Sequence, residues 1–134
     1  HGLCQLVAYP IIRLASYGLN VGRYMKLLEN TVIQTLATYG ITGKLHPSAI
    51  GVWVDQSVGP AAKICAMGVR VRRNITLHGL ALNVTTNLSH FATIIPCGLA
   101  GRPVTSMQQM LGSQTPAMQD VKNELVRQFR LSLM

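Results

Sequence analysis

The sequence predicts an α/β or α+β fold, with a hairpin-rich sheet and flanking helices. Three observations predict it. Apolar residues recur at helical spacing from Asn20 to Tyr39, two β-like runs fill Lys63 to Val84, and Thr115-Pro116 opens a second amphipathic segment. A length of 134 residues suits one domain, so we expect a single domain over residues 1–134.

The first segments predict a strand and then a helix. Gln5 to Ile12 is apolar but contains Pro10, which cannot donate to a sheet ladder, so an edge or terminal strand is expected. Asn20 can cap the helix that follows, and Gly40 stands where a C-cap glycine belongs. The apolar positions at helical spacing are Val21, Tyr24, Leu28, Val32 and Leu36.

The middle of the chain has the composition of β-strands. Ile50 to Val54 is a short β-like run, and Asp55 to Pro60 is rich in turn residues. Lys63 to Arg73 and Ile75 to Val84 are two further runs separated by little more than Asn74, which predicts a hairpin.

Strand alternation assigns faces to the first strand of this hairpin. One face should carry Lys63, Cys65, Met67, Val69 and Val71, and the other should carry Ile64, Ala66 and Gly68. Gly68 and Gly79 interrupt the two strands. Glycine within a strand marks a bulge or a close approach to the backbone, and simple packing is the alternative.

The last third predicts short elements and a final helix. Asn87 to Ile94 suits a helical turn, and Pro96-Cys97-Gly98 is a turn with cysteine at its centre. Thr105 or Ser106 can cap a short helix, and Thr115-Pro116 places proline where a last helix begins. The stripe of that helix expected to face the core is Met118, Val121, Leu125, Val126 and Phe129.

Charge and composition bound the class of partner. Twelve Lys and Arg residues against four acidic residues give a net charge of +8, which favours acidic partners: nucleic acid, an anionic membrane or an acidic protein. No apolar run reaches the roughly 18 residues of a membrane span, so no membrane segment is expected. Aromatic residues are too few to favour a stacking platform for bases.

Several kinds of chemistry have no motif in this sequence. There is no glycine-rich dinucleotide or phosphate loop and no Gly-x-Ser-x-Gly. The sequence has only four acidic residues, which argues against paired-carboxylate chemistry and against a metal site built from carboxylates. Three cysteines without a Cys-x-x-Cys spacing indicate neither a disulfide framework nor a zinc site.

Cys97 is the main candidate nucleophile because a turn can present its thiol. A nucleophilic thiolate needs a nearby cation or base. Lys63 begins an apolar strand, where partial burial would lower its pKa, although a lysine at a strand start usually points into water. The spacing alone leaves the partner open among Lys63 and the histidines His1, His46, His78 and His90.

Three stretches in this order resemble the lipoyl(octanoyl) transferases, also called lipoate–protein ligase B. They are Lys63-Ile64-Cys65-Ala66-Met67-Gly68-Val69, His78-Gly79-Leu80-Ala81-Leu82-Asn83-Val84 and Pro96-Cys97-Gly98. The resemblance implies a biotin/lipoate ligase-like fold, a mixed sheet with flanking helices. It also implies an ATP-independent, metal-free acyltransferase that moves an octanoyl or lipoyl group from acyl carrier protein to a lipoyl-domain lysine, the first step of endogenous protein lipoylation.

The resemblance also assigns roles to residues. Cys97 would form an acyl-enzyme thioester and Lys63 would be its catalytic partner. Contacts to the substrate would come from His1, Ala66, Met67, Gly68, Gly79, Leu80 and Ala81. The implied acceptors are lipoyl domains of 2-oxoacid dehydrogenases and the glycine cleavage H protein, with no nucleic acid and no membrane. Bacterial cytoplasm and mitochondrial matrix both fit.

The sequence departs from the family at its start. The family's opening motif, Arg-Gly-Gly-x-x-Thr-aromatic-His-Gly-Pro-Gly-Gln, survives here only as His1-Gly2-Leu3-Cys4-Gln5, with Leu3 and Cys4 in place of proline and glycine. We therefore expect an N-terminal part to be missing. Three alternatives stay open: an inactive truncated relative, an ATP-dependent ligase of the same fold, and a basic non-catalytic domain that binds nucleic acid.

Overall fold

The computed structural model describes residues 5–85 and 102–134. In this part of the chain one sheet has the strand order β1-β5-β4-β3-β2, and all of its neighbouring strands pair antiparallel. The strands are β1 (Gln5–Ala8), β2 (Lys44–His46), β3 (Ala49–Val54), β4 (Ala62–Arg72) and β5 (Ile75–Asn83). The helices are α1 (Val21–Thr38), α3 (Met107–Leu111) and α4 (Met118–Leu133). A sheet with flanking helices is therefore confirmed.

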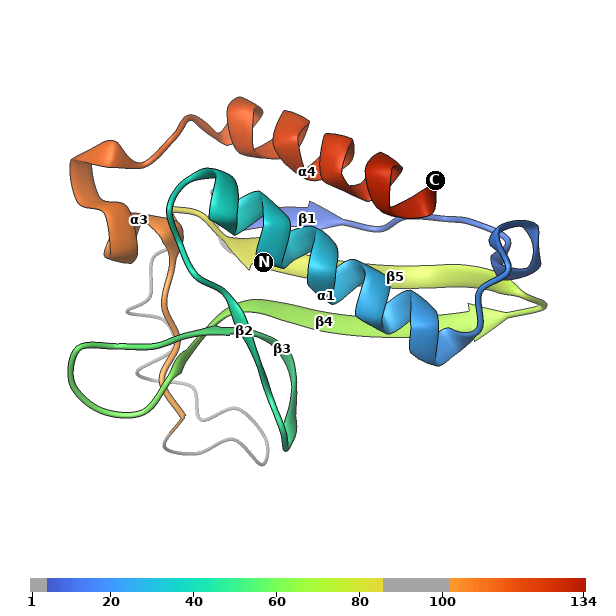
Figure 1. Ribbon diagram of the computed structural model, residues 1–134, viewed down its shortest axis with the longest axis horizontal. Coiled ribbons are helices and arrows are strands. Elements are labelled where there is room, and N and C mark those ends of the chain that lie inside the picture. Colours follow the sequence, from blue (N-terminus) through green and yellow to red (C-terminus); the bar gives the residue numbers. More distant parts are fainter. Residues whose placement is uncertain (1–4, 86–101) are drawn as a thin grey trace.

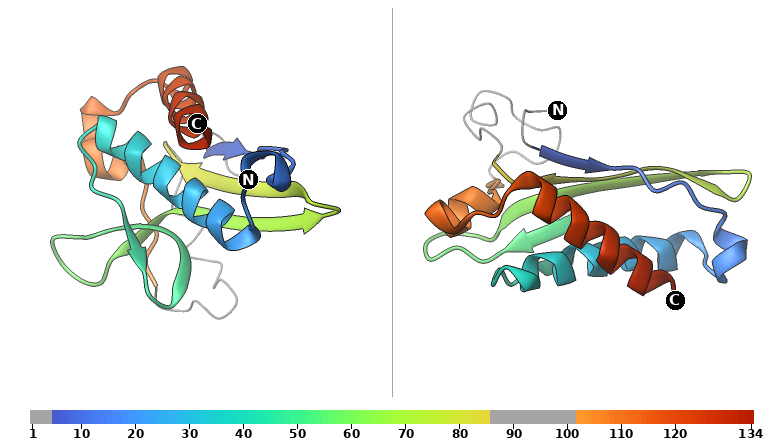
Figure 2. Two further views of the ribbon diagram at one scale, coloured as in Figure 1. Left: turned by 45° about the vertical axis from the view of Figure 1, so that its right-hand side comes forward. Right: turned by 90° about the horizontal axis from the view of Figure 1, so that it is seen from above.

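The molecule has two layers. Helices α1 and α4 lie side by side over the same face of the sheet, and the views from the front and from above agree on this (Figures 1 and 2). The core fills the space between the two layers, and its largest members include Tyr24, Leu28, Ile64 and Leu82. Lys63, Ala66 and Gly68, which belong to the candidate site, lie toward the other face of the sheet. No helix among the described residues has the length and apolarity that crossing a membrane requires.

Helix α1 begins and ends where its capping residues predict. The Asn20 side chain accepts a 2.8 Å hydrogen bond from the Arg23 amide, and Gly40 follows the helix with a φ of 80°. A positive φ suits glycine, which has no Cβ to clash. Four of the five predicted apolar positions are fully buried. The exception is Val21, the first residue of the helix, which is 47% exposed.

The hairpin of β4 and β5 is confirmed, with an unbroken register from Cys65↔Leu82 to Arg72↔Ile75. Its turn consists of Arg73 and Asn74, which both have positive φ. Two consecutive left-handed residues are the geometry that matches the twist of a tight hairpin.

The edge strand is also confirmed. β1 pairs only with β5 among the described strands, and beyond Pro10 the chain returns to β5 through hydrogen bonds between Ile12 and Thr76. Three elements were not predicted: the short strand β2 and two 3-10 turns, over Leu14–Tyr17 and Gly112–Gln114. All three are too short to show a period in the sequence.

The expected alternation along β4 is wrong at its start. The register with β3 shifts between Val52↔Cys65 and Trp53↔Lys63. As a result, the consecutive residues Ile64 and Cys65 are both fully buried in the core cluster. This bulge moves Lys63 off the face of Cys65 and onto the outer face, which it shares with Ala66 and Gly68.

The last helix begins later than predicted. Its N-cap is Ala117, and the Thr115 hydroxyl instead donates to the Gly112 carbonyl within a 3-10 turn. The preceding short helix is capped as expected, by a hydrogen bond from the Gln109 amide to the Ser106 hydroxyl. The stripe of α4 packs on the core except at Val126, which is 45% exposed on the flank of the helix.

Candidate functional site

Lys63 lies where three strand-like segments meet. It opposes Trp53 of β3 on one side and forms a parallel bridge with Val104 on the other. Its amide donates to the Pro103 carbonyl at 3.0 Å, and its carbonyl accepts from the Thr105 amide at 2.8 Å. Both hydrogen bonds of the Lys63 backbone therefore run to the segment 103–105, on the side away from Trp53.

The side chain of Lys63 lies over an aromatic ring. Its Nζ is 5.3 Å from the centroid of the Trp53 ring, and the guanidinium of Arg102 lies 5.8 Å from the same centroid. Trp53 is only 1% exposed, although it does not belong to the core cluster between the sheet and the helices. Two cations thus share one buried ring on the outer face of the sheet.

Burial lowers the pKa of Lys63 below its usual value of 10.5, and the positive charge of Arg102 lowers it further. Cys65 has a smaller, opposite effect. This confirms the predicted direction of the shift. A lysine with a lowered pKa is neutral in a larger fraction of molecules at neutral pH, and only the neutral amine accepts a proton.

Polar contacts extend this cluster toward β2. Arg102 donates through Nη2 to the Ser48 hydroxyl at 3.2 Å, and that hydroxyl lies 3.1 Å from Nδ1 of His46. The His46 ring lies 5.1 Å from the Trp53 ring, centre to centre. Sequence reasoning did not assign a role to Trp53 or Arg102, and their separation along the chain gave no local signal that they meet at Lys63.

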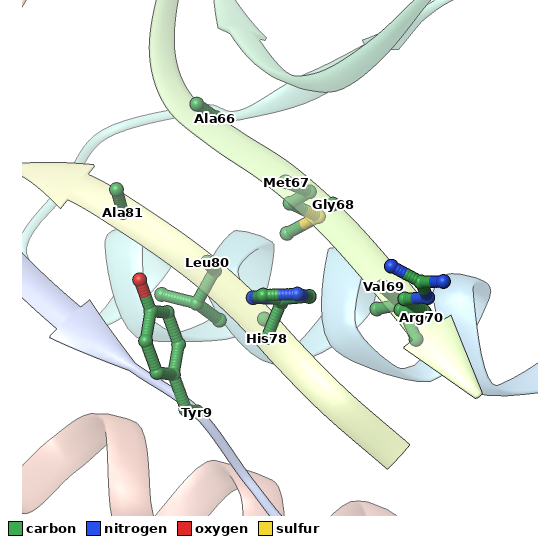
Figure 3. A pocket seen from close by; sticks show the side chains of 10 residues that line it. Tyr9, Ala66, Met67, Gly68, Val69, Arg70, His78, Leu80 and Ala81 are labelled. Atoms are coloured by element: carbon green, nitrogen blue, oxygen red, sulfur yellow. The ribbon is translucent and has the colours of Figure 1, made fainter. Parts of the chain in front are cut away.

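The six described residues expected to contact substrate line one open hollow of about 410 Å³ on the sheet (Figure 3). They come from adjacent strands, since Ala66 pairs with Ala81, Met67 with Leu80 and Gly68 with Gly79. Tyr9, Val69, Arg70 and His78 complete the lining. The structure thus brings the six residues together, and their role in binding an acyl chain stays a prediction.

The two strand glycines have different surroundings. A Cβ built on Gly79 would overlap the carbonyl oxygen of Ala8, so this glycine is needed for the close approach of the end of β1. A Cβ on Gly68 would meet no atom of residues 5–85 and 102–134 within 4 Å. Of these two glycines, Gly68 is therefore the one where, among the described residues, space is left above the sheet for a ligand to approach the backbone.

The candidate bases are separated along the sheet. His78 pairs with Val69, six residues beyond Lys63 on β4, which corresponds to roughly 20 Å of strand. His46, by contrast, belongs to the Lys63 cluster through Trp53. Cys97, His1 and His90 lie outside the described residues, as do the predicted turns at 87–94 and 96–98. In the described ranges, no three metal-ligating side chains group together.

Comparison with known proteins places this geometry in a family. The lipoyl protein ligase A/B catalytic domain matches residues 1–130, which include most of the last helix. The chain is 50% identical to an octanoyltransferase of Chloroflexus aggregans over 94% of its length, and 45% identical to one of Bacteroides fragilis over 100%. It spans 56% and 60% of these two relatives.

Solved structures share the fold. The biotin protein ligase of Aquifex aeolicus superposes with a TM-score of 0.71 at 12% identity, covering 97% of this chain and 53% of the ligase. A lipoate protein ligase of Thermoplasma acidophilum with bound lipoic acid gives a TM-score of 0.64 at 16% identity, covering 96% and 50%. These likenesses confirm the predicted architecture of the sheet and helices.

Proposed function

The chain belongs to the lipoyl protein ligase A/B catalytic domain family, and on this premise we propose that it is part of an octanoyltransferase that works without ATP or metal. The donor is octanoyl-loaded acyl carrier protein, and the acceptor is a lysine of a lipoyl domain. The octanoyltransferase names of its relatives support this reaction. The net charge of +8 suits two acidic protein partners.

The observation that carries the proposal is the surroundings of Lys63. Lys63 has a buried ring and the charge of Arg102 as neighbours, which go with an amine of lowered pKa. It lies on β4 three residues before Ala66, the first residue of this strand that lines the hollow. Cys97 is only five residues from Arg102 in sequence.

In the first step, the Cys97 thiolate attacks the carbonyl carbon of the octanoyl thioester. The bond from that carbon to the carrier's sulfur breaks, and the carrier leaves as a thiol after taking a proton from the Lys63 ammonium. Lys63 is then neutral, and the octanoyl group is on Cys97. Positive charge near a cysteine favours its thiolate, and Lys63 and Arg102 supply that charge.

In the second step, the amine of the acceptor lysine attacks the Cys97 thioester. Lys63 accepts the proton that the attacking amine loses, and the thiolate of Cys97 leaves. An amide has formed, and the Cys97 thiolate and Lys63 ammonium are regenerated. Dividing one transfer into two easier steps is what covalent catalysis offers. Since a thioester already activates the acyl group, the reaction needs no nucleotide.

Intact mass spectrometry tests this proposal. The chain is incubated with octanoyl-loaded acyl carrier protein without ATP, in parallel with Cys97→Ser and Lys63→Met. We expect one octanoyl group on the wild-type chain, removable by hydroxylamine and discharged by a lipoyl domain. Cys97→Ser should show no adduct, and Lys63→Met should form it far more slowly.

Three outcomes would contradict the proposal. An adduct of equal rate in Lys63→Met would remove lysine from the mechanism. Absence of any adduct on folded wild-type chain would favour an inactive relative, and the same test on a longer chain with the family's opening motif restored would then show whether that motif is required. Consumption of labelled ATP would instead indicate a ligase.

A further inference from the structure

Lys44, Trp53 and Lys63 form a row across three neighbouring strands. Lys44 of β2 and Lys63 of β4 each pair with Trp53 of β3, from opposite sides. Residues that lie directly opposite each other carry their side chains on the same face, so the row lies on the outer face of the sheet. The two lysines differ in one respect. The Lys44 ammonium pairs with the Asp55 carboxylate, whereas no acidic side chain of residues 5–85 and 102–134 pairs with Lys63.

The side chain of Lys63 packs along β3, because a glycine leaves room for it there. A Cβ built on Gly51 would lie only 3.3 Å from Cε and 3.6 Å from Cδ of Lys63. Gly51 also has a φ of 125°, which other residues rarely adopt. The stem of Lys63 therefore runs past Gly51, and its ammonium reaches the Trp53 ring.

Arg102 reaches the same ring from a distant part of the sequence. Its Nη2 donates to the hydroxyl of Ser48, which lies in the turn between β2 and β3. The backbone that follows Arg102 is bonded to Lys63, through the Pro103 carbonyl and the Thr105 amide. The guanidinium is thus anchored on one side to the β2–β3 hairpin and on the other to the strand of Lys63.

This placement of Arg102 does not serve stability alone. Its Nη1 is buried and finds no acceptor in the part of the chain that the structure describes. A buried donor without an acceptor costs free energy, and so does a second cation beside Lys63. An unpaired buried donor in a native structure calls for an explanation, and a role in function is one of the recognised ones.

We propose that Arg102 is a positioning residue for Lys63: anchored by Ser48, its guanidinium shares the Trp53 ring and prevents the ring from holding the lysine as an unreactive cation. The face of an aromatic ring attracts a cation, and more strongly where water is excluded. Burial first, and the charge of Arg102 second, lower the pKa of Lys63. The inference rests on the proposed function, because it takes Lys63 as the group that gives and accepts the proton. It gives Arg102 no contact with the reacting atoms.

Trace labelling with acetic anhydride tests this without any need for acyl transfer activity. Peptide mass spectrometry gives the acetylation rate of Lys63 relative to the exposed Lys122 in the same folded molecule. Arg102→Met removes the charge and the bond to Ser48, and Arg102→Lys keeps a charge at this position. Lys44→Met removes an equal charge from the same row and is the matched control, because Lys44 has its own partner in Asp55.

We expect the relative labelling of Lys63 to fall by about tenfold in Arg102→Met, which corresponds to about one unit of pKa, because only the neutral amine reacts. Arg102→Lys should restore most of the labelling, and Lys44→Met should match the wild type. Ser48→Ala should cause a smaller loss of labelling. It should cause no further loss in the Arg102→Met background, because Ser48 acts through Arg102.

Octanoyl transfer by the same variants connects the labelling to the reaction. In Arg102→Met we expect kcat to fall by about tenfold or more, with an unchanged KM for octanoyl-loaded acyl carrier protein and recovery of kcat in Arg102→Lys. A purely structural role would lower the melting temperature and the amount of folded chain. It would leave the labelling of Lys63 in folded molecules unchanged.

Equal labelling of Lys63 in wild type and Arg102→Met would overturn the inference. So would a loss that Arg102→Lys does not restore, or an equal loss in Lys44→Met, because neither depends on a charge held at Arg102. If Arg102→Met does not fold, Ser48→Ala decides the question by the same ratio. The proposed function is judged separately: a chain whose labelling behaves as expected but that forms no Cys97 adduct refutes acyl transfer and leaves the control of Lys63 by Arg102 standing.

Discussion

Lys63 and Trp53 oppose each other across β4 and β3, and the ammonium of Lys63 lies 5.3 Å from the centre of the tryptophan ring. Two effects of this pairing act in opposite directions. The face of the ring attracts a cation, which favours the charged lysine. Partial burial of the ammonium removes it from water, which disfavours the charged lysine. The pKa of Lys63 is lowered, with burial as the larger cause and the charge of Arg102 as the second.

Replacing Arg102 should therefore raise the pKa of Lys63. Arg102→Gln removes the positive charge that disfavours a second cation over the Trp53 ring, while it keeps a side chain able to donate to Ser48. Reductive ¹³C-methylation followed by NMR titration measures the lysine, with Lys63→Arg to assign its signal. Arg127→Gln on α4 removes an equal charge away from this cluster and should leave the titration unchanged. A pKa that does not move in Arg102→Gln would refute the electrostatic role given to Arg102.

Cys65 should resist alkylation in the folded protein. It is fully buried, and burial raises the pKa of its thiol to about 12, so almost no reactive thiolate exists at pH 8. In a Cys4→Ser, Cys97→Ser background, Cys65 is the one remaining thiol. Iodoacetamide should then label it only as fast as the chain unfolds, with a rate that rises with urea. Rapid labelling in native buffer would show that Cys65 is accessible and that the bulge at β4 is misplaced.

The bulge at Ile64 and Cys65 also shows what the sequence could not indicate. The hairpin, the edge strand and helix α1 follow from local signals: a turn residue, a proline, and caps at both ends of an amphipathic run. A one-residue register shift between β3 and β4 depends on how the two strands meet, and alternation within β4 alone predicted the wrong face for Lys63.

The candidate site also has a part that could be predicted and a part that could not. The small residues of the hollow and the lowered pKa of Lys63 could be predicted from the sequence of two strands. Trp53, Arg102 and His46 could not, because tertiary contacts alone bring them to Lys63. The left-handed backbone of His78 was not predicted either, because histidine adopts a positive φ more often than most residues but too rarely for its presence alone to indicate one.

The two glycines of the hairpin should differ sharply in their tolerance of a methyl group. In Gly79→Ala the new Cβ would overlap the Ala8 carbonyl oxygen, so the end of β1 must move away from β5. We expect the free energy of unfolding to fall by about 1–3 kcal/mol, the usual cost of overpacking. The methyl group of Gly68→Ala meets no atom in the part of the chain that the structure describes and should change stability by less than about 1 kcal/mol. Urea denaturation of both variants checks this, and equal stabilities would contradict the close approach at Gly79.

Glu124 should make the packing of α4 on α1 sensitive to acid. Its carboxylate accepts hydrogen bonds from Arg127 and Gln128 within α4 and from the Thr38 hydroxyl at the end of α1, at 2.8 to 3.0 Å. These contacts, led by Arg127, lower the pKa of Glu124 from 4.5 to about 2. A lowered pKa means that the unfolded chain binds a proton at a higher pH than the folded chain does.

The contribution of Glu124 to stability is therefore fully present well above pH 4.5 and is lost as the pH falls toward 2. The unfolding free energy of wild type minus that of Glu124→Gln should be positive and constant near neutrality, and should shrink across this window. Other carboxylates, including Glu29, are present in both proteins and cancel in the difference. Thr38→Ala should weaken the wild type more than it weakens Glu124→Gln, because it removes one of the same contacts. A difference that stays constant down to pH 2 would show that Glu124 does not link the two helices.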